Sequence, residues 1–353
     1  MFDGLAQACD IFNTTIIFEF CSRFFNSFLQ LMNLYKNVPE VQLLILEFFA
    51  DISRYADFES MGDKRKESLY NVIIEIFKVY GLSSSGKTRI LTQEEEADQP
   101  YADIVAALNI MSNIMTSEFE SFNRANGATA AQGSPDVADV VFFGINLLIP
   151  NINMEMLKIP SLCQQYIKLI SNLIEFFPDK LIGIPPGLFG NLMASLEYGM
   201  GHDITDVNIL SFQAIAPLAL WAYTQELQQV TNFPSSPLIP APIDFLKPSL
   251  EKFLHLNLEL LLFKDFDPRL LDAASASLFP LINCCRSSYL TAVNQIIQQQ
   301  PVDIQDRLMS AFRNLDTVTP SHLSEPSIVR HSQIFSEALL VLLREVRGVI
   351  RVK

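Results

Sequence analysis

Apolar residues recur every three or four positions along most of this 353-residue chain, which is the spacing of one face of an α-helix. A first clear stripe covers residues 20–35, and after "NVP" a second covers residues 41–52. Pro39 and Glu40 suit the first turn of the second helix, because that turn needs no donor from proline and favours negative charge. The pattern predicts two helices joined by a tight turn.

The same unit of helix, turn and helix returns along the rest of the chain. The pairs are spaced by about 40 to 47 residues, which is the period of HEAT and armadillo arrays. We therefore predict an all-α fold, an α-solenoid of HEAT-like antiparallel helix pairs, with roughly thirteen to fifteen helices. Similarity between the repeats is weak, so a globular helical bundle is the alternative. The further stripes cover residues 69–80, 104–115, 137–149, 162–177, 188–200, 207–230, 243–263, 270–285, 289–297, 302–315 and 328–346.

Three breaks in the pattern are longer than a tight turn, at residues 81–100, 123–135 and 232–242. We interpret residues 1–353 as a single HEAT-repeat array and the three breaks as long loops that project from it. Loops on one face of a repeat array often carry the contacts with partners. The first of them therefore contains the leading candidate for a binding site.

That candidate is the acidic cluster, defined as Glu94, Glu95, Glu96 and Asp98, the densest run of charge in the chain. A run of this kind in a loop is often no more than a solvated segment. On a solenoid it can also steer a basic partner towards the array, because the field of like charges extends beyond the surface. We predict that the acidic cluster binds a protein partner.

Composition narrows the function classes. Hydrophobic residues make up 49% of the chain and the mean hydropathy is +0.24, so much of the chain must be buried. The apolar runs are shorter than the about 18 residues of a membrane span, and the N-terminus has no basic segment of a signal peptide. A formal charge of −14 opposes binding to nucleic acid and anionic membranes. We predict a soluble protein without membrane insertion, whose large partners are basic proteins.

Residues 81–88 read "GLSSSGKT", which matches the phosphate-binding loop of nucleotide hydrolases and makes an NTPase that uses Lys87 and Thr88 the enzymatic alternative. A working loop follows a buried strand and opens a helix. Here the preceding stripe, residues 69–80, has helical spacing, and the glutamates of the acidic cluster would repel phosphates. We interpret the motif as a linker between helices.

The remaining reactive residues give no pattern of an enzyme, a metal site or a cofactor site. The four histidines are scattered and the five cysteines form no C-x-x-C pair, so the thiols are expected to be reduced and buried. Trp221, next to Pro217 on an apolar helix, is expected to be a core aromatic at a kink. The histidines are His202, His255, His322 and His331, and the cysteines are Cys9, Cys21, Cys163, Cys284 and Cys285.

Long blocks of the chain resemble the C-terminal part of the exportin-4 family, which are karyopherins of the importin-β superfamily. The blocks include "LYKNVPEVQLLILEFFADI", "SLYNVIIEIFKVY", "DVVFFGINLLIPNINMEMLKIPSLCQQYIKLISNLIEFFPDKL", "LFGNLMASLEYGM", "DRLMSAFRNL" and the final "GVIRVK". They extend from about residue 12 to the end, and their specificity comes from length and order, because they are packing and turn patterns without a catalytic signature.

The resemblance implies an acidic HEAT superhelix that carries protein cargo through the nuclear pore under control of the Ran GTPase, shuttling between cytoplasm and nucleus. The implied cargoes are the hypusine-bearing translation factor five A and Smad proteins, and the implied partners include nuclear pore proteins. Ran-GTP would bind through N-terminal repeats that this chain lacks. A free-standing HEAT-type adaptor without a link to Ran is the alternative. An array cut from a longer one is expected to expose an apolar repeat interface near residues 12–28.

Overall fold

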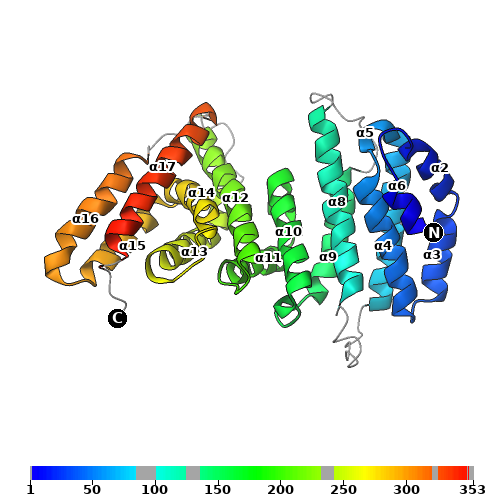
Figure 1. Ribbon diagram of the computed structural model, residues 1–353, viewed down its shortest axis with the longest axis horizontal. Coiled ribbons are helices and arrows are strands. Elements are labelled where there is room, and N and C mark those ends of the chain that lie inside the picture. The colour runs from blue at the N-terminus through cyan, green and yellow to red at the C-terminus, as the bar shows by residue number, and fades with distance from the viewer. Residues whose placement is uncertain are drawn as a thin grey trace. The chain divides into compact units, whose positions relative to one another are not determined.

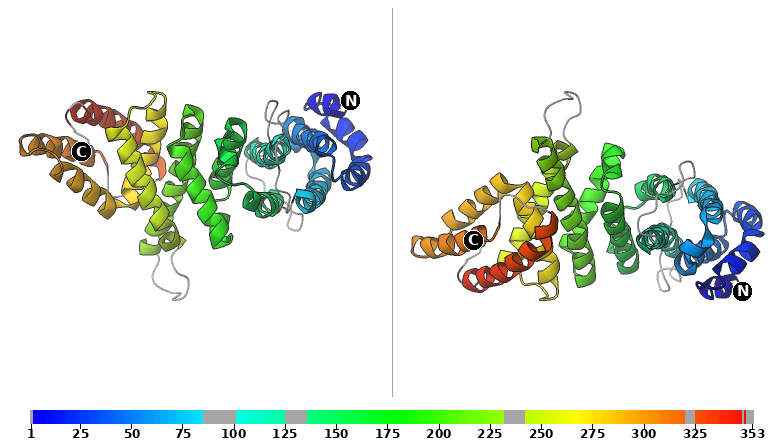
Figure 2. Two further views of the ribbon diagram at one scale, coloured as in Figure 1. Left: turned by 90° about the horizontal axis from the view of Figure 1, so that it is seen from below. Right: turned by 90° about the horizontal axis from the view of Figure 1, so that it is seen from above.

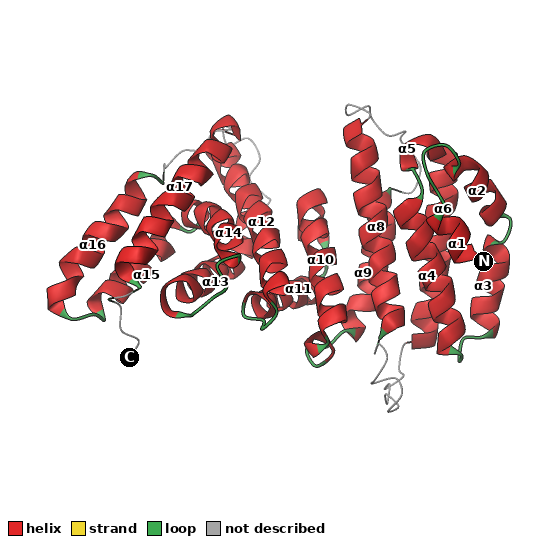
Figure 3. Ribbon diagram, in the orientation of Figure 1, coloured by secondary structure: helices red, strands yellow, loops and turns green. Residues whose placement is uncertain are grey.

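The computed structural model describes residues 2–84, 101–124, 136–231, 242–319, 325–347 and 349, and within them every regular element is a helix (Figure 3). The α-helices there number sixteen, joined by three short 3-10 helices, η1 to η3. This confirms the all-α prediction. The α-helices are α1 (Phe2–Gln7), α2 (Thr14–Ser22), α3 (Phe25–Leu34), α4 (Pro39–Tyr55), α5 (Phe58–Met61), α6 (Asp63–Ser84), α8 (Ala102–Arg124), α9 (Val137–Leu148), α10 (Pro160–Phe176), α11 (Pro186–Met200), α12 (Thr205–Thr231), α13 (Pro242–Phe263), α14 (Leu270–Cys284), α15 (Arg286–Gln298), α16 (Val302–Thr317) and α17 (Glu325–Val346).

The chain divides into two compact units, Met1–Phe177 and Pro178–Lys353. In unit 1 the helices form two layers, one of α3, α6 and α9 and the other of α4, α8 and α10, with each helix packed on the next in its layer (Figures 1 and 2). Successive helices along the chain alternate between the layers. This is the stacking expected for HEAT-like antiparallel pairs.

Unit 2 repeats the arrangement. One layer contains α11, α13 and α15, the other contains α12, α14 and α17, and α16 packs on both α15 and α17. Both units therefore bury the apolar stripes of their helices against the neighbouring pair, which confirms the fold class of HEAT-like helix pairs. The single array over residues 1–353 remains a prediction.

Most helix boundaries lie within two or three residues of the predicted ones, but the stripe at residues 20–35 is not one helix. The structure ends α2 at Ser22 and begins α3 at Phe25. Between them the backbone N–H of Phe24 donates to the carbonyl of Cys21 at 2.9 Å, a bond to residue i−3 that tightens the end of α2. The periodicity continues across this break, which is why the apolar pattern did not reveal it.

Three edges of the predicted loops are helical in the structure. Helix α6 continues to Ser84, α8 continues to Arg124 and α13 begins at Pro242, so these edges are helical. The first four residues of "GLSSSGKT" therefore form the end of α6. The motif follows a helix and not a strand, which confirms the prediction from the spacing of residues 69–80. Lys87 and Thr88 lie outside the described residues.

Helix α12 contains Pro217, as expected, but Trp221 is only partly buried and is not a core residue. Over Thr205–Glu226 this helix is long and apolar enough to cross a membrane by length and composition alone. In an apolar 18-residue window of that stretch 56% of the residues are buried within the protein, and α12 packs on α11, α13 and α14. Its apolar character is accounted for by its place in the core of unit 2.

Two glycines permit the close approach of helices in unit 1. A Cβ added at Gly81 would lie 2.5 Å from Leu147 of α9, and one added at Gly144 would lie 2.5 Å from the sulfur of Met111 and 3.0 Å from the ring of Phe77. A side chain at either position would have to displace these neighbours, so the two glycines favour the observed separation of α6, α8 and α9. Gly81, the first residue of the phosphate-loop motif, thus has a packing role.

We predict that Gly144→Ala lowers the free energy of unfolding of unit 1 by about 1–3 kcal/mol, because the methyl group overpacks the contact with Met111 and Phe77. The matched control is Gly190→Ala on α11, where nothing lies within 4 Å of the added Cβ. That change should stabilise by about 0.5–1 kcal/mol through helix propensity. Thermal and urea unfolding would measure both, and equal effects of the same sign would contradict the packing account.

Candidate functional site

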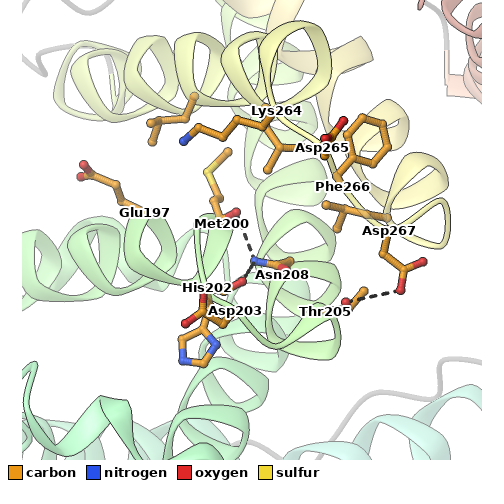
Figure 4. A pocket seen from close by; sticks show the side chains of 14 residues that line it. Glu197, Met200, His202, Asp203, Thr205, Asn208, Lys264, Asp265, Phe266 and Asp267 are labelled. Atoms are coloured by element: carbon orange, nitrogen blue, oxygen red, sulfur yellow. Dashed lines mark hydrogen bonds between the residues drawn. The ribbon is translucent and has the colours of Figure 1, made fainter.

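The acidic cluster lies outside the described residues, so its role as the partner-binding site remains a prediction. A different polar feature is visible in unit 2, a cleft of about 350 Å³ between the ends of two helix pairs (Figure 4). One wall is formed by the end of α11, the turn after it and the start of α12, including Glu197, His202 and Asp203. The other wall is formed by the end of α13, the next turn and the start of α14, including Lys264 and Asp267.

Asn208 holds the first wall in place. Its side chain is 8% exposed, and Nδ2 donates to the carbonyl oxygens of Gly199 at 2.8 Å, Met200 at 3.2 Å and His202 at 2.8 Å. The last carbonyls of a helix have no partner at residue i+4, and Asn208 supplies a donor to three carbonyls at this end, of which Gly199 also accepts from the backbone N–H of His202 at 3.2 Å. His202 Nδ1 accepts from the backbone N–H of Ile204 at 3.0 Å, which fixes the turn as well.

A bond across the cleft connects the two turns. Thr205 Oγ1 donates to Asp267 Oδ2 at 3.5 Å, and Asp267 also accepts from Nε and Nη2 of Arg269 at 2.9 and 2.8 Å. The hydrogen bonds from Arg269 lower the pKa of the Asp267 carboxyl. Asp267 is therefore a carboxylate whose position is fixed by Thr205 and Arg269. Nη1 of Arg269 also lies 3.8 Å from Oδ1 of Asp206.

Other cations around the cleft are paired too. Lys252 lies 2.5 Å from Glu197, and Lys264 lies 3.2 Å from Glu259. Arg347, just after α17, stacks over the ring of Phe266 at 4.8 Å and donates to the carbonyl of Lys264. Arg347 also lies 3.5 Å from the carboxylate of Asp265, which is exposed to solvent. The positive charges are thus neutralised locally, whereas Asp203 has no ion pair within the described part of the chain.

Carboxylates are the most numerous charged groups that line the cleft. Among the described residues no group of three His, Cys, Asp or Glu side chains is placed to hold a metal ion. No cysteine lines the cleft, and burial raises the pKa of the Cys163 and Cys285 thiols elsewhere to about 11 and about 12, so these thiols are neutral at physiological pH. A neutral, buried thiol is a poor nucleophile. The cleft offers carboxylates, which suit a basic group.

Sequence reasoning missed this cleft because its two walls are far apart along the chain. Thr205 and Asp267 are separated by 62 residues, and nothing in either turn distinguishes it from an ordinary connection between helices. One signal in the sequence could have indicated the cleft. The segments "GHDIT" (residues 201–205) and "KDFDP" (residues 264–268) occupy similar positions in successive helix pairs, and each has aspartate in the turn. Such turns stack in a repeat array, so their side chains meet.

Comparison with known proteins gives two findings. A family model described as Exportin-4 matches residues 7–353. A curated exportin-4 of Dictyostelium discoideum is 23% identical over 316 residues, which are 89% of this chain and 26% of that relative. The chain therefore spans about a quarter of the length of the curated relative that it matches.

We predict that Asn208→Ala lowers the free energy of unfolding of unit 2 by about 1–3 kcal/mol, because it removes three hydrogen bonds that a buried amide makes to backbone carbonyls. Hydrogen exchange should locate the loss at residues 199–208, where the carbonyl partners lie. Asn146→Ala on α9 is the matched control, since that exposed amide only donates to the carbonyl of Phe142 in its own helix. A loss no larger than that of the control would contradict the role given to Asn208.

Proposed function

The chain belongs to the exportin-4 family, and we propose that it forms part of a nuclear transport receptor that carries protein cargo out of the nucleus under the control of Ran. The observation that carries this proposal is the match of one family over residues 7–353, nearly the whole chain. The stacked helix pairs and the formal charge of −14 support it, because receptors of this kind bind proteins over extended, charged surfaces.

The proposal concerns the longer protein of which this chain corresponds to about a quarter. Its cargo would be protein, with the hypusine-bearing translation factor five A and Smad proteins as the leading candidates from the family. Ran-GTP would bind mainly to repeats outside this chain. Nuclear pore proteins would bind the receptor during its passage through the pore. The receptor would shuttle between nucleus and cytoplasm, and it would bind its partners without catalysis.

The contribution of this chain would be part of the cargo surface. The acidic cluster is the first candidate contact, because it concentrates four negative charges within five residues. The cleft in unit 2 is the second, because Asp203 on its wall has no ion pair within the described part of the chain, whereas the nearby cations are already paired. Both features favour a basic partner.

Ran control makes a quantitative prediction, since coupling between two ligands is reciprocal. The native protein, purified from source cells, should retain cargo at least about tenfold better with Ran loaded with a non-hydrolysable GTP analogue than with Ran-GDP. Hypusine-bearing translation factor five A serves as the probe, measured by affinity capture and quantitative blotting. Retention that is the same with either form of Ran, or without Ran, would favour the alternative of a HEAT-type adaptor.

The acidic cluster should act through long-range attraction. Removing its charges should slow association with a basic cargo by about tenfold at low ionic strength and much less at high salt, because salt screens the interaction. Stopped-flow or surface binding kinetics would measure the rates. The variant combines E94Q, E95Q, E96Q and D98N.

The control removes the same number of negative charges from exposed positions on α16 and α17, by D303N, D306N, E337Q and E345Q. If this control slows association as much as the variant of the acidic cluster, the effect is one of net charge. In that case the acidic cluster is not a binding site.

A further inference from the structure

Asn208 has one side-chain atom that takes no part in holding the end of α11. Its Nδ2 donates to the carbonyl oxygens of Gly199, Met200 and His202, and Figure 4 shows two of these bonds. Because carbonyl oxygens only accept hydrogen bonds, these three partners determine which way round the amide lies. Oδ1 is therefore held in a fixed orientation, and it has no hydrogen-bond partner within the described part of the chain.

This oxygen is accessible from the cleft. Asn208 is a buried residue of α12 that lines the cleft. The amide oxygen of Asn257, in α13, also lacks a donor among the described residues, but that atom is enclosed. Oδ1 of Asn208 is not enclosed in this way. An acceptor that is already oriented by three bonds can receive a donor from a ligand without first being ordered, which favours binding.

The charged groups around Asn208 favour a cationic ligand. Asp203 lies in the turn that Asn208 holds, and this exposed aspartate has no ion pair among the described residues. Lys264, the one lysine among the lining residues, is paired with Glu259 at 3.2 Å. Asn208 and Asp203 thus provide two unused acceptors on the same wall. The carboxylates that line the cleft are Glu197, Asp203, Asp265 and Asp267.

The cleft also has an apolar part, which indicates the shape of the ligand. Met200 and Leu270 are buried, Leu260 is partly buried, and all three line the cleft. Arginine and lysine side chains combine an apolar stem with a charged end, so they match both parts of this lining. A volume of about 350 Å³ is at the small end of the range for ligand sites, so it suits one side chain.

Arginine fits these acceptors better than lysine. A guanidinium has five donors in a planar fork and can therefore bond to a carboxylate and an amide oxygen at the same time. It is also more weakly hydrated than an ammonium group, so it loses less when it leaves water for a partly buried site.

We propose that the cleft binds one arginine side chain of a partner protein. The guanidinium bonds to the carboxylate of Asp203 and to Oδ1 of Asn208, and the methylene groups lie against Met200 and Leu260. The inference rests on the proposed function, because it names the group by which a basic cargo is held. Asn208 then has two roles, as the donor that holds the end of α11 and as an acceptor for the ligand.

Methionine-methyl NMR of the recombinant 353-residue chain tests the proposal, because Met200 lines the cleft and Met309 is exposed on α16. The probe is Nα-acetyl-L-arginine methylamide. It should shift the Met200 signal in a saturable manner and leave that of Met309 unchanged. The lysine analogue should bind at least about threefold more weakly. The citrulline analogue, which has the shape of arginine without its charge, should give no saturable shift.

Substitution tests the acceptors separately. Asp203→Asn should weaken binding of the arginine probe by about tenfold, because a charge-assisted hydrogen bond becomes a neutral one. Asp303→Asn on α16 is the matched control, an exposed aspartate outside the cleft, and it should leave the affinity unchanged. Asn208→Ala should weaken binding too. Since that change also removes bonds that stabilise unit 2, Asp203→Asn decides the question if the Asn208 variant does not fold.

Three results would overturn the proposal. They are the absence of a saturable shift at Met200, equal affinity for the arginine and lysine probes, and equal affinity of the Asp203→Asn and Asp303→Asn variants. The second result would make the cleft a general site for cations. These measurements contain neither Ran nor cargo, whereas the proposed function is tested by retention of cargo on the native protein. Failure of one proposal is therefore distinguishable from failure of the other.

Discussion

The structure depends on one constraint, that a pair of amphipathic helices cannot bury both of its apolar sides by itself. Helix α4 illustrates it, because Phe48 and Phe49 are fully buried only through contacts of α4 with α1, α3 and α8. The same condition applies to each pair in turn, so the stability of any pair is partly that of its neighbours.

Apolar stacking alone would not fix how far one helix slides along the next, and a small number of polar contacts do so. Between α4 and α8, Asn113 donates to the carbonyl of Ala50 at 2.9 Å and Ser117 donates to the carbonyl of Ser53 at 3.0 Å. Between α13 and α14, the buried amide of Asn257 donates to the carbonyl of Ala274 at 3.0 Å. A buried donor that loses its acceptor costs free energy, so each contact disfavours a shifted register.

The difference between local patterns and contacts of distant segments explains which features the sequence could predict. Helical periodicity is a local property, so the stripes identified all of the α-helices of the described residues except the two shortest, α1 and α5, and α2, of which only the last three residues fall within a stripe. Features that depend on contacts between distant segments were not accessible: the cleft requires two turns 62 residues apart, and the need for glycine at position 144 arises only from Met111 and Phe77. The break between α2 and α3 was missed because the apolar pattern passes through it unchanged.

The phosphate-loop motif shows how a packing role can replace a chemical one. A glycine at the start of "GLSSSGKT" is required in a nucleotide hydrolase because the backbone must approach a phosphate. In this chain Gly81 lies in α6, and the space that a side chain would occupy is filled by Leu147 of α9. The residue is thus explained by the approach of two helices, and that explanation also applies to Gly144, which belongs to no motif. A match to the fixed residues of a motif therefore indicates a function only after the packing contacts of each residue have been examined.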